Sequence, residues 1–523
     1  MRHGTIRWRR FAAALLLSSL GLSGPVAASQ TPSDATPGTG SAATFEEGPC
    51  LWDLPRNLDG GHAITCGFVT VPLFHADPDG ATIRLAVGVV RPDRGEVSGE
   101  PVFMLNGGPG GDSGPLLDLF APNFLASYAN LRKGREVVVF DQRGTGFSEP
   151  GLYCQGDTDP TTGDRIGTED GDAVSDERAY EAEGAACAAS LGESTDLTAF
   201  TTTESAQDIA DIRVALGYDG IDLWGQSYGT RLALEAMRLF PKGVVRSVVL
   251  ESVLAPDRPF LSTFVVGFND ALVRLADACA ADRDCDAAYP DVTGDFERAV
   301  DRFNADPYDT SFADLSTGKS TDITVDGPVI NYLVYQLIFS GVFVGVVPDF
   351  LHAVANGETA ALEPYLPFLS ETPVATGFYY SVLCQDEIPF ESDEGTAAEV
   401  EAADVLPVIE DDRVGFGVSD YFAVCRGFDL PSSDPVQSEP VRSDIPTLIV
   451  SGEYDPITPP SNGEDAARTL SNSQVVVGSA LAHTPIAFSQ RCLLAGTIDF
   501  LDDPDQVVDF SCADDLDVEF LTP

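Results

Sequence analysis

The sequence predicts an α/β fold built on a mostly parallel sheet, with a mainly helical insertion between two of its last strands. Short apolar runs alternate with glycine-rich turns and helical patterns through the first half of the chain. This alternation is typical of parallel strands joined by helical crossovers. The periodicity turns mostly helical over residues 256–441, and two short apolar runs follow it. The chain is therefore expected to form one large α/β unit that carries an insertion.

The N-terminal residues are typical of a secretory signal. Four arginines precede an apolar run over residues 11–22, which is too short to span a bilayer. Small residues then predict cleavage after Ala28, so residues 1–28 are expected to be removed on export. Residues 29–45 are rich in Ser, Thr, Pro, Gly and Ala and are expected to form a disordered leader. Because of this signal we expect a secreted protein, extracellular or periplasmic. No later apolar run is long enough to cross a membrane.

The composition is strongly acidic, with a formal net charge of −52 at pH 7. A surface of this charge repels nucleic acid and anionic membranes, so neither is expected as a partner. The acidity fits a saline habitat, where salt would screen it, and fits equally a lysine-poor extracellular protein. The oligomeric state is left open, and a monomer is compatible with the sequence.

The ten cysteines of this exported chain are expected to be oxidised. Spacing alone does not fix their connectivity, but they fall into five neighbouring pairs with modest loops. We expect the pairs Cys50–Cys66, Cys154–Cys187, Cys279–Cys285, Cys384–Cys425 and Cys492–Cys512. None has the paired C-x-x-C spacing of a zinc site, and neither a metal nor an organic cofactor is expected.

Eight short apolar runs are expected to form strands of the sheet. They cover residues 68–74, 82–90, 101–105, 136–140, 221–224, 245–250, 446–452 and 474–477. These runs divide the chain into a first part of the core, an inserted helical cap and a C-terminal part of the core. The three parts are expected at residues 46–255, 256–441 and 442–523.

A sharp turn is expected at residues 225–229, which read Gly-Gln-Ser-Tyr-Gly. An apolar run leads into this G-x-S-x-G pattern, and a helical pattern over residues 230–240 follows it. In this context the pattern indicates a nucleophile elbow, in which flanking glycines permit the turn and the Ser227 hydroxyl stands exposed at its apex. The pentapeptide can also arise by chance in a glycine-rich chain, so its assignment depends on the rest of the sequence.

A serine hydroxyl becomes a good nucleophile only when a base takes its proton and a carboxylate orients that base. Of the five histidines, only His483 lies in a loop after the last predicted strand. Asp455 lies in the loop after the preceding strand. The order Ser227, Asp455, His483 is that of the α/β-hydrolase fold, and these residues are the expected catalytic triad. Asp444 and Glu453 are alternative acids.

Acyl transfer also needs N–H donors aimed at the developing oxyanion. The N–H that follows the nucleophile, that of Tyr228, is expected to supply one. The glycine-rich turn over residues 106–111 is expected to supply the other from Gly108, with Gly107 as the near alternative.

The same turn contains Gly-Asp-Ser-Gly-Pro at residues 111–115, which resembles the active-serine motif of chymotrypsin-like proteases. That fold needs many short antiparallel strands, and the chain has no Ala-His-Cys segment to supply its histidine. We therefore expect Ser113 to cap a helix over residues 114–128 rather than to react.

Four motifs together resemble the proline iminopeptidase branch of the α/β-hydrolases, and most of all its secreted tripeptidyl aminopeptidases. They lie at residues 106–110, 141–148, 225–229 and 455–459. The resemblance covers the chain from about residue 46 onward and implies a serine exopeptidase acting near a free N-terminus through an acyl-enzyme. It also implies that Asp141 and Arg143 brace the oxyanion turn. Proline iminopeptidases typically open that turn with His, whereas Asn106 stands here, which argues against strict specificity for a single proline.

An aminopeptidase must hold an α-ammonium group, and a carboxylate in a partly dehydrated pocket is the physical means. The candidates are Glu251, which follows a strand end near the site, and Asp386 and Glu387 in the cap. The expected substrates are peptides with a free N-terminus.

Two other functions are compatible with parts of the pattern. A carboxylesterase or lipase would use the same triad and oxyanion donors. A non-catalytic binding protein on a hydrolase fold would be expected to have lost a triad member, and this chain retains all three.

Overall fold

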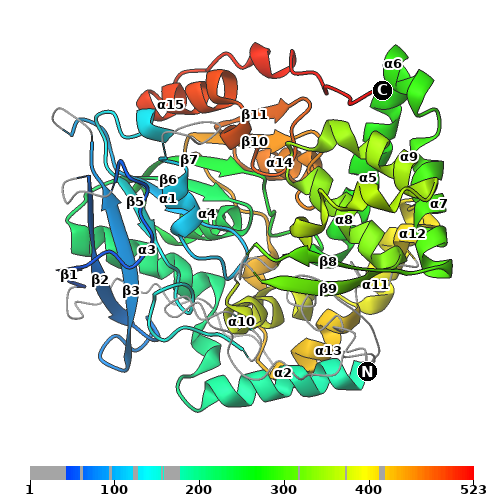
Figure 1. Ribbon diagram of the computed structural model, residues 1–523. Coiled ribbons are helices and arrows are strands. Elements are labelled where there is room, and N and C mark those ends of the chain that lie inside the picture. Colours follow the sequence, from blue (N-terminus) through cyan, green and yellow to red (C-terminus); the bar gives the residue numbers. More distant parts are fainter. Residues whose placement is uncertain are drawn as a thin grey trace.

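The computed structural model describes residues 43–58, 63–92, 97–121, 128–154, 157, 177–315, 319–370, 374–410 and 419–523. Within them, nine strands form one central sheet in the order β1-β2-β3-β5-β4-β6-β7-β10-β11 (Figure 1). The expected signal peptide, residues 29–42 of the expected leader and His62 lie outside the described residues.

The sheet is antiparallel at one edge and parallel over the rest. β1, β2, β3 and β5 pair antiparallel in turn, whereas β5, β4, β6, β7, β10 and β11 pair parallel in turn. The strands are β1 Phe45–Gly48, β2 Ile64–Pro72, β3 Thr82–Val90, β4 Val102–Leu105, β5 Val137–Phe140, β6 Ile221–Gln226, β7 Val245–Glu251, β10 Thr447–Gly452 and β11 Ser473–Gly478. The predicted mostly parallel sheet is confirmed, and β1 is an edge strand that the sequence analysis did not predict.

Helices cover both faces of the sheet, as its strands require, because they are apolar on both sides. On one face α3 and α4 pack, with α14, against Phe103, Leu223 and Ile449. On the other face α1 and α15 pack against Met104, Trp224 and Val450. The helices of the core are α1 Gly114–Asp118, α3 Thr202–Leu216, α4 Tyr228–Leu239, α14 Pro460–Ala467 and α15 Ala495–Asp502.

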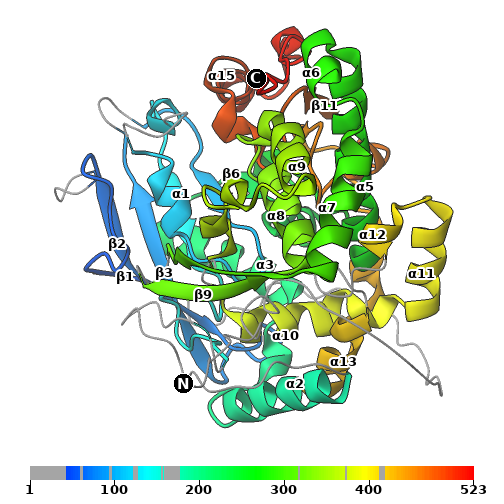
Figure 2. The same ribbon diagram turned by 45° about the vertical axis from the view of Figure 1, so that its right-hand side comes forward.

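The chain between β7 and β10 is mainly helical and lies to one side of the sheet (Figures 1 and 2). Its helices are α5 Phe260–Ala281, α6 Arg283–Ala288, α7 Val292–Ala305, α8 Gly327–Phe339, α9 Val347–Ala355, α10 Thr376–Asp386, α11 Asp393–Ala402, α12 Pro407–Glu410 and α13 Ser419–Phe428. We keep residues 256–441 as the proposed extent of this cap. Two features of it were not predicted: an antiparallel pair of strands, β8 Tyr308–Ala313 and β9 Ser320–Val325, and a break between α8 and α9 near Gly341, whose φ is 71°.

Helix α2 Glu177–Gly192 precedes β6 in the sequence but packs against the cap. It lies along α13 in both ribbon views, and a Cβ added to Gly184 would stand 2.5 Å from the carbonyl oxygen of Val424 (Figures 1 and 2). The first part of the chain therefore contributes a helix to the insertion, which a division by sequence ranges does not capture.

All ten cysteines form disulfides, and no free cysteine is found. The bonds are Cys50–Cys66, Cys154–Cys187, Cys279–Cys285, Cys384–Cys425 and Cys492–Cys512. The predicted pairing of sequence neighbours is confirmed at each position. The Cys154–Cys187 bond joins α2 to the segment after β5, and the Cys384–Cys425 bond joins α10 to α13.

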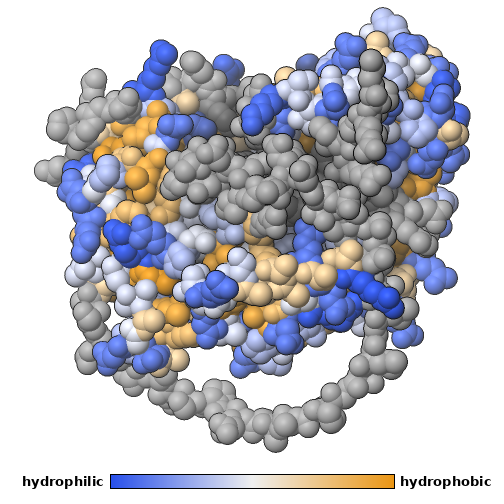
Figure 3. Space-filling model, turned by 60° about the horizontal axis from the view of Figure 1, so that its bottom comes forward, coloured by the Kyte–Doolittle hydropathy of each residue, from blue (hydrophilic) through white to orange (hydrophobic). Residues whose placement is uncertain are grey.

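No helix of the described chain combines the length and apolar character needed to cross a membrane. The face seen in Figure 3 mixes hydrophilic and hydrophobic residues. Large hydrophobic side chains that stand exposed, such as Val97, Leu315 and Val507, are spread along the chain.

A cluster of buried charges fastens the loop after β5 to α3. The Arg143 guanidinium donates two hydrogen bonds to Asp208, of 2.8 and 2.7 Å, and a third to the carbonyl oxygen of Ala199. His75, at the end of β2, contacts Glu204 and lies 3.3 Å from Asp211. These contacts of the fully buried Arg143 side chain lead to α3 and not to the oxyanion turn, so its expected role in bracing that turn stays a prediction.

This cluster predicts that stability falls as pH rises. Burial opposes the charge of His75, but the carboxylates of Asp211, Glu204 and Asp208 outweigh it and raise its pKa to about 9. The pKa of a histidine side chain in the unfolded protein is about 6.5. The cluster therefore stabilises the fold fully below that pH and loses its contribution as pH rises through about 9. We expect the free energy of unfolding to fall by on the order of 3 kcal/mol between these limits. Denaturant titrations of the native protein and of His75→Gln would measure it, and an identical pH slope in both would contradict this account.

Candidate active site

Ser227 stands at a sharp turn between β6 and α4. Its φ of 54° and ψ of −124° lie outside the regions that most residues adopt. The flanking glycines are required by close backbone contacts: a Cβ on Gly225 would stand 2.3 Å from the oxygen of Gly229, and one on Gly229 would stand 2.0 Å from the oxygen of Leu105. The strand–turn–helix arrangement expected from the sequence is present, and sterics explain its glycines.

The glycine-rich turn after β4 lies directly against this serine. β4 and β6 are parallel neighbours, so the turn that follows β4 reaches the same edge of the sheet. A Cβ on Gly107 would stand 2.9 Å from the Cβ of Ser227 and 3.4 Å from its Oγ. Gly108 has a φ of 120°, which only glycine adopts readily. Backbone N–H groups can therefore approach Ser227 here without side chains between them.

Asp455 and His483 meet at the ends of β10 and β11. The Nδ1 atom of His483 lies 2.8 Å from the Oδ2 atom of Asp455. Thr458 donates to the same carboxylate from its N–H, at 2.9 Å, and from its hydroxyl, at 2.8 Å. Burial of Asp455 opposes its ionisation, but the nearby His483 and these hydrogen bonds outweigh burial and lower its pKa. This environment holds a carboxylate that orients the imidazole.

The alternative acids lie elsewhere. Asp444 precedes β10 and pairs with Lys242 at 2.9 Å on the exposed surface. Glu453 accepts a long hydrogen bond of 3.4 Å from the N–H of Ala480. Among the histidines, His352 pairs with Asp295 in the cap. Of the residues considered for acid and base, Asp455 and His483 are the two found in contact.

Asp141 hydrogen-bonds Ser113, which follows the glycine-rich turn beside Ser227. Its carboxylate accepts hydrogen bonds from the N–H of Ser113 at 2.7 Å, the N–H of Phe147 at 2.8 Å and the indole of Trp52 at 3.2 Å. Complete burial raises its pKa to about 7, together with the charge of Asp112, while the two N–H donors act the other way. These contacts are compatible with the expected structural role of Asp141, and its part in bracing the oxyanion turn stays a prediction.

The helix expected over residues 114–128 is found only as α1 Gly114–Asp118, and residues 122–127 lie outside the described residues. Ser113 makes no side-chain cap; its hydroxyl donates instead to the carbonyl oxygen of Phe140 at 2.6 Å. This hydroxyl is fully buried, which agrees with the expectation that Ser113 does not react.

Two of the three carboxylates considered for binding a substrate amine are occupied by the protein itself. Glu251 is fully buried and accepts three N–H hydrogen bonds. Asp386, also fully buried, accepts from the N–H of Thr202 at 2.7 Å and from the hydroxyl of Ser433. The structure does not support either residue as an amine ligand, because their oxygens are engaged and have no exposed surface.

Glu387 differs from these two. Its Oε1 atom lies 3.0 Å from the Nη2 atom of Arg231, in an ion pair that does not have the geometry of a hydrogen bond. Burial raises the pKa of Glu387 to about 8, although the charge of Arg231 acts in the opposite direction. It is a buried carboxylate whose hydrogen-bonding capacity is only partly used.

The cap touches both parts of the candidate site. Phe339, the last residue of α8, stacks on the His483 ring with centroids 4.6 Å apart and planes inclined at 23°. On the other side, the N–H of Ala375 donates to the oxygen of Gly110 at 3.0 Å. No local sequence pattern predicts these contacts, since they join segments more than 100 residues apart.

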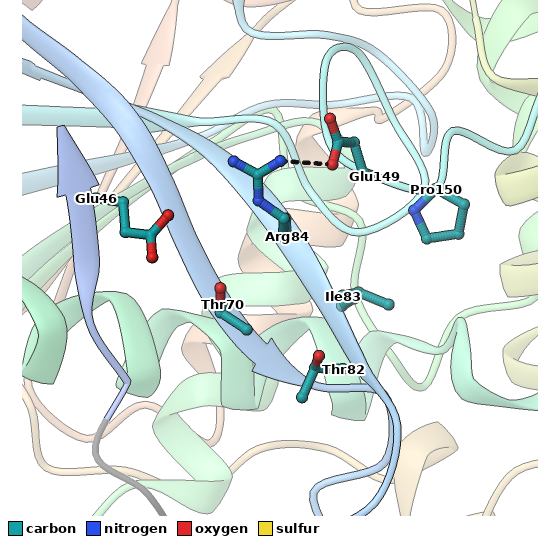
Figure 4. Close-up of a pocket in the computed structure, with 7 residues that line it drawn as sticks. All are labelled: Glu46, Thr70, Thr82, Ile83, Arg84, Glu149 and Pro150. Carbon is teal, nitrogen blue, oxygen red and sulfur yellow. Dashed lines mark hydrogen bonds and ion pairs between the residues drawn. The ribbon is translucent and has the colours of Figure 1, made fainter. Parts of the chain in front are cut away.

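A hollow on the surface lies apart from these residues. Its lining comes from β1, β2, β3 and the segment after β5, and includes an Arg84–Glu149 ion pair of 2.8 Å (Figure 4). It contains no member of the candidate triad.

A family model described as an alpha/beta hydrolase fold matches residues 100–277, the region that includes the elbow and the turn after β4. The chain has the α/β-hydrolase fold. A second model, described as a TAP-like protein, matches residues 413–512, which include Asp455 and His483. This α/β-hydrolase is thus matched on both sides of the cap.

Two relatives extend the comparison. A tripeptidyl aminopeptidase of Streptomyces lividans is 34% identical over 222 residues, which is 41% of this chain and 38% of that relative's length. The serine protease Hip1 of Mycobacterium tuberculosis (strain ATCC 25618 / H37Rv) is 24% identical over 479 residues, which is 85% of this chain and 86% of Hip1.

Among solved structures, a proline iminopeptidase of Mycobacterium smegmatis matches 84% of this chain and 98% of its own, with 16% identity and a TM-score of 0.39. The fold assignment rests on the strand order and the family model rather than on this likeness.

Proposed function

We propose that this α/β-hydrolase is a secreted serine exopeptidase that hydrolyses peptide bonds near a free N-terminus, in the manner of a tripeptidyl or proline-type aminopeptidase. The observation that carries the proposal is the 2.8 Å hydrogen bond between Asp455 and His483 at the sheet edge where the Ser227 elbow also ends. The tripeptidyl aminopeptidase and Hip1 relatives support a peptide as the substrate. The five disulfides are typical of proteins outside the reducing cytosol and support export.

In the proposed reaction, the Nε2 atom of His483 takes the hydroxyl proton of Ser227 as Oγ attacks the scissile carbonyl carbon. Asp455 holds the Nδ1 proton and stabilises the imidazolium that forms. The N–H groups of Tyr228 and Gly108 donate to the oxyanion of the tetrahedral intermediate. The intermediate collapses when His483 gives its proton to the leaving amine, and the same base then activates water to hydrolyse the acyl-enzyme.

Glu387 is the proposed receptor of the substrate's α-ammonium group. Its partner Arg231 lies four residues after Ser227 on α4, about 6 Å further along the helix axis. An extended substrate spans about 3.5 Å per residue, so the amine of a short peptide falls about 7–10 Å from the scissile bond. We propose that the carboxylate beside Arg231 receives the amine of a substrate from which a few residues are released. Its Oε1 atom, which pairs with Arg231 but makes no hydrogen bond, is the proposed acceptor of a charge-assisted hydrogen bond from the ammonium.

The experiment compares a tripeptide p-nitroanilide that has a free N-terminus with its N-acetylated form. Acetylation removes the positive charge, so the proposed contact between the ammonium group and Glu387 is lost, which costs about 2–5 kcal/mol of recognition. We expect kcat/KM to fall by roughly 30-fold or more. Glu387→Gln should reduce turnover of the free peptide by a similar factor and leave the acetylated one little changed.

Glu391→Gln is the matched control. This half-buried carboxylate lies in the same segment but accepts hydrogen bonds from the N–H groups of Phe260 and Leu261 at the start of α5. We expect it to lower stability without altering the ratio of the two substrates. Equal rates on both compounds, or brisk turnover of acyl esters alone, would reject the exopeptidase and favour a carboxylesterase or lipase.

A further inference from the structure

The carboxylate of Glu251 joins the segment that carries Ser227 to the segment that follows His483. Its Oε2 atom accepts hydrogen bonds from the indole of Trp224, at 2.9 Å, and the amide of Gln226, at 2.8 Å. Its Oε1 atom accepts the N–H of Ile486 at 2.9 Å. Trp224 and Gln226 belong to β6 immediately before the elbow, whereas Ile486 lies three residues beyond His483. One buried side chain therefore contacts both halves of the candidate site.

The residues at the end of β7 make two further hydrogen bonds, one to the Ser227 elbow and one to the His483 loop. The N–H of Ser227 donates to the Glu251 carbonyl oxygen at 2.9 Å. The hydroxyl of Ser252 accepts the N–H of Thr484, the residue after His483, at 2.9 Å. Ser252 and Thr484 both have positive φ, of 59° and 50°. Non-glycine residues hold such conformations only where their surroundings fix them.

We propose that Glu251, assisted by Ser252, is a positioning residue that holds the His483 loop in register with the Ser227 elbow. This role rests on the proposed function, because it presupposes that Ser227 and His483 react as a pair. An error of about 1 Å in such a pair costs about 10²-fold in rate, so a link that spans both segments affects catalysis without touching the substrate.

The charge of Glu251 also bears on His483. Three N–H groups donate hydrogen bonds to this carboxylate. A protonated carboxyl group would lose part of this hydrogen bonding, so the pocket fits the ionised form of Glu251, although burial raises its pKa. Two titratable side chains interact with it from other segments: His483, and Tyr128, which lies against Trp224. An ionised Glu251 favours the imidazolium form of His483. Loss of this charge should therefore move the acid limb of the pH profile to lower pH.

Glu251→Gln is the direct test. The amide oxygen of the new side chain can still accept the hydrogen bonds of Trp224 and Gln226, but its NH2 group is a donor and cannot accept the hydrogen bond of the Ile486 N–H. The readout is the rate at which a fluorophosphonate labels Ser227, which requires no peptide substrate. We expect this rate and kcat to fall by about 10- to 100-fold with KM nearly unchanged, and the acid limb to shift to lower pH.

Asp222→Asn is the matched control. Asp222 is an equally buried carboxylate on β6, paired with Arg246 and Ser247, but it lies four residues before Gln226, or about 13 Å along the strand. It should lose stability and keep the native labelling rate and pH profile. If Glu251→Gln loses stability but labels at the native rate with an unshifted acid limb, the positioning role is wrong.

Absence of labelling at Ser227 in the native protein would overturn the catalytic assignment and this role with it, whereas equal rates in native and variant protein would overturn this role alone. Should Glu251→Gln fail to fold, Ser252→Ala cuts the second link. We expect it to slow labelling several-fold, and an unchanged rate would also overturn the proposal.

Discussion

Replacing Ser227 by alanine is expected to lower kcat/KM by about 10⁴- to 10⁶-fold while the protein stays folded. The hydroxyl is the group that forms the proposed acyl-enzyme, and what remains is turnover from the oxyanion donors and substrate binding alone. Alanine has no larger side chain than serine at this strained turn, so the elbow should persist. Steady-state kinetics on the free tripeptide p-nitroanilide would measure the loss, and calorimetry would show whether the fold is retained.

Ser113→Ala is the control for this substitution. Ser113 lies in the other serine motif of the chain, but its buried hydroxyl donates to the Phe140 carbonyl oxygen. We expect this variant to be labelled by a fluorophosphonate at the native rate. Labelling that persists in Ser227→Ala, or disappears in Ser113→Ala, would show that the nucleophile is misassigned.

The sequence was sufficient where short-range sterics dictate structure. The glycines at positions 225 and 229 are required because any Cβ there would collide with a carbonyl oxygen, and this constraint makes the elbow readable as a pentapeptide. The strand ends that precede Asp455 and His483 were readable for a similar reason, since the parallel strands of a covered sheet are continuous apolar runs.

The sequence was insufficient where burial depends on distant segments. Glu251 follows a strand end beside the site, as a substrate-binding carboxylate would, yet its oxygens are taken by Trp224, Gln226 and Ile486. No local pattern marks the difference, because Ile486 is 235 residues away. The same applies to Asp386, whose partner Thr202 belongs to the core.

The cap was predicted in composition but not in detail. Strands β8 and β9 are short and partly exposed, so they lack the apolar runs that identified the central sheet. The helical pattern of residues 328–355 continues across the break near Gly341, because α8 and α9 both bury apolar faces in the same cap core. Hydrophobic periodicity indicates which residues face a core, but it does not indicate where the helix axis changes direction.

The acid of the proposed triad gives the second large effect. Asp455→Asn is expected to lower kcat by about 10³- to 10⁴-fold and to leave KM nearly unchanged. The carboxylate accepts from Thr458 twice and from the Nδ1 atom of His483. An amide in its place donates toward one of these groups, so His483 is driven to the tautomer whose Nε2 carries the proton and cannot accept that of Ser227.

The lowered pKa of Asp455 gives this prediction a pH dependence. A carboxyl group with a depressed pKa stabilises the fold above its unfolded value of about 3.9 and loses that contribution as pH falls through the lower folded value. Asp455→Asn should therefore lose stability at neutral pH and differ little from the native protein in strong acid. Asp444→Asn and Glu453→Gln remove the alternative acids, neither of which contacts His483, and should keep native activity. If either of them loses activity while Asp455→Asn keeps it, the acid of the triad is not Asp455.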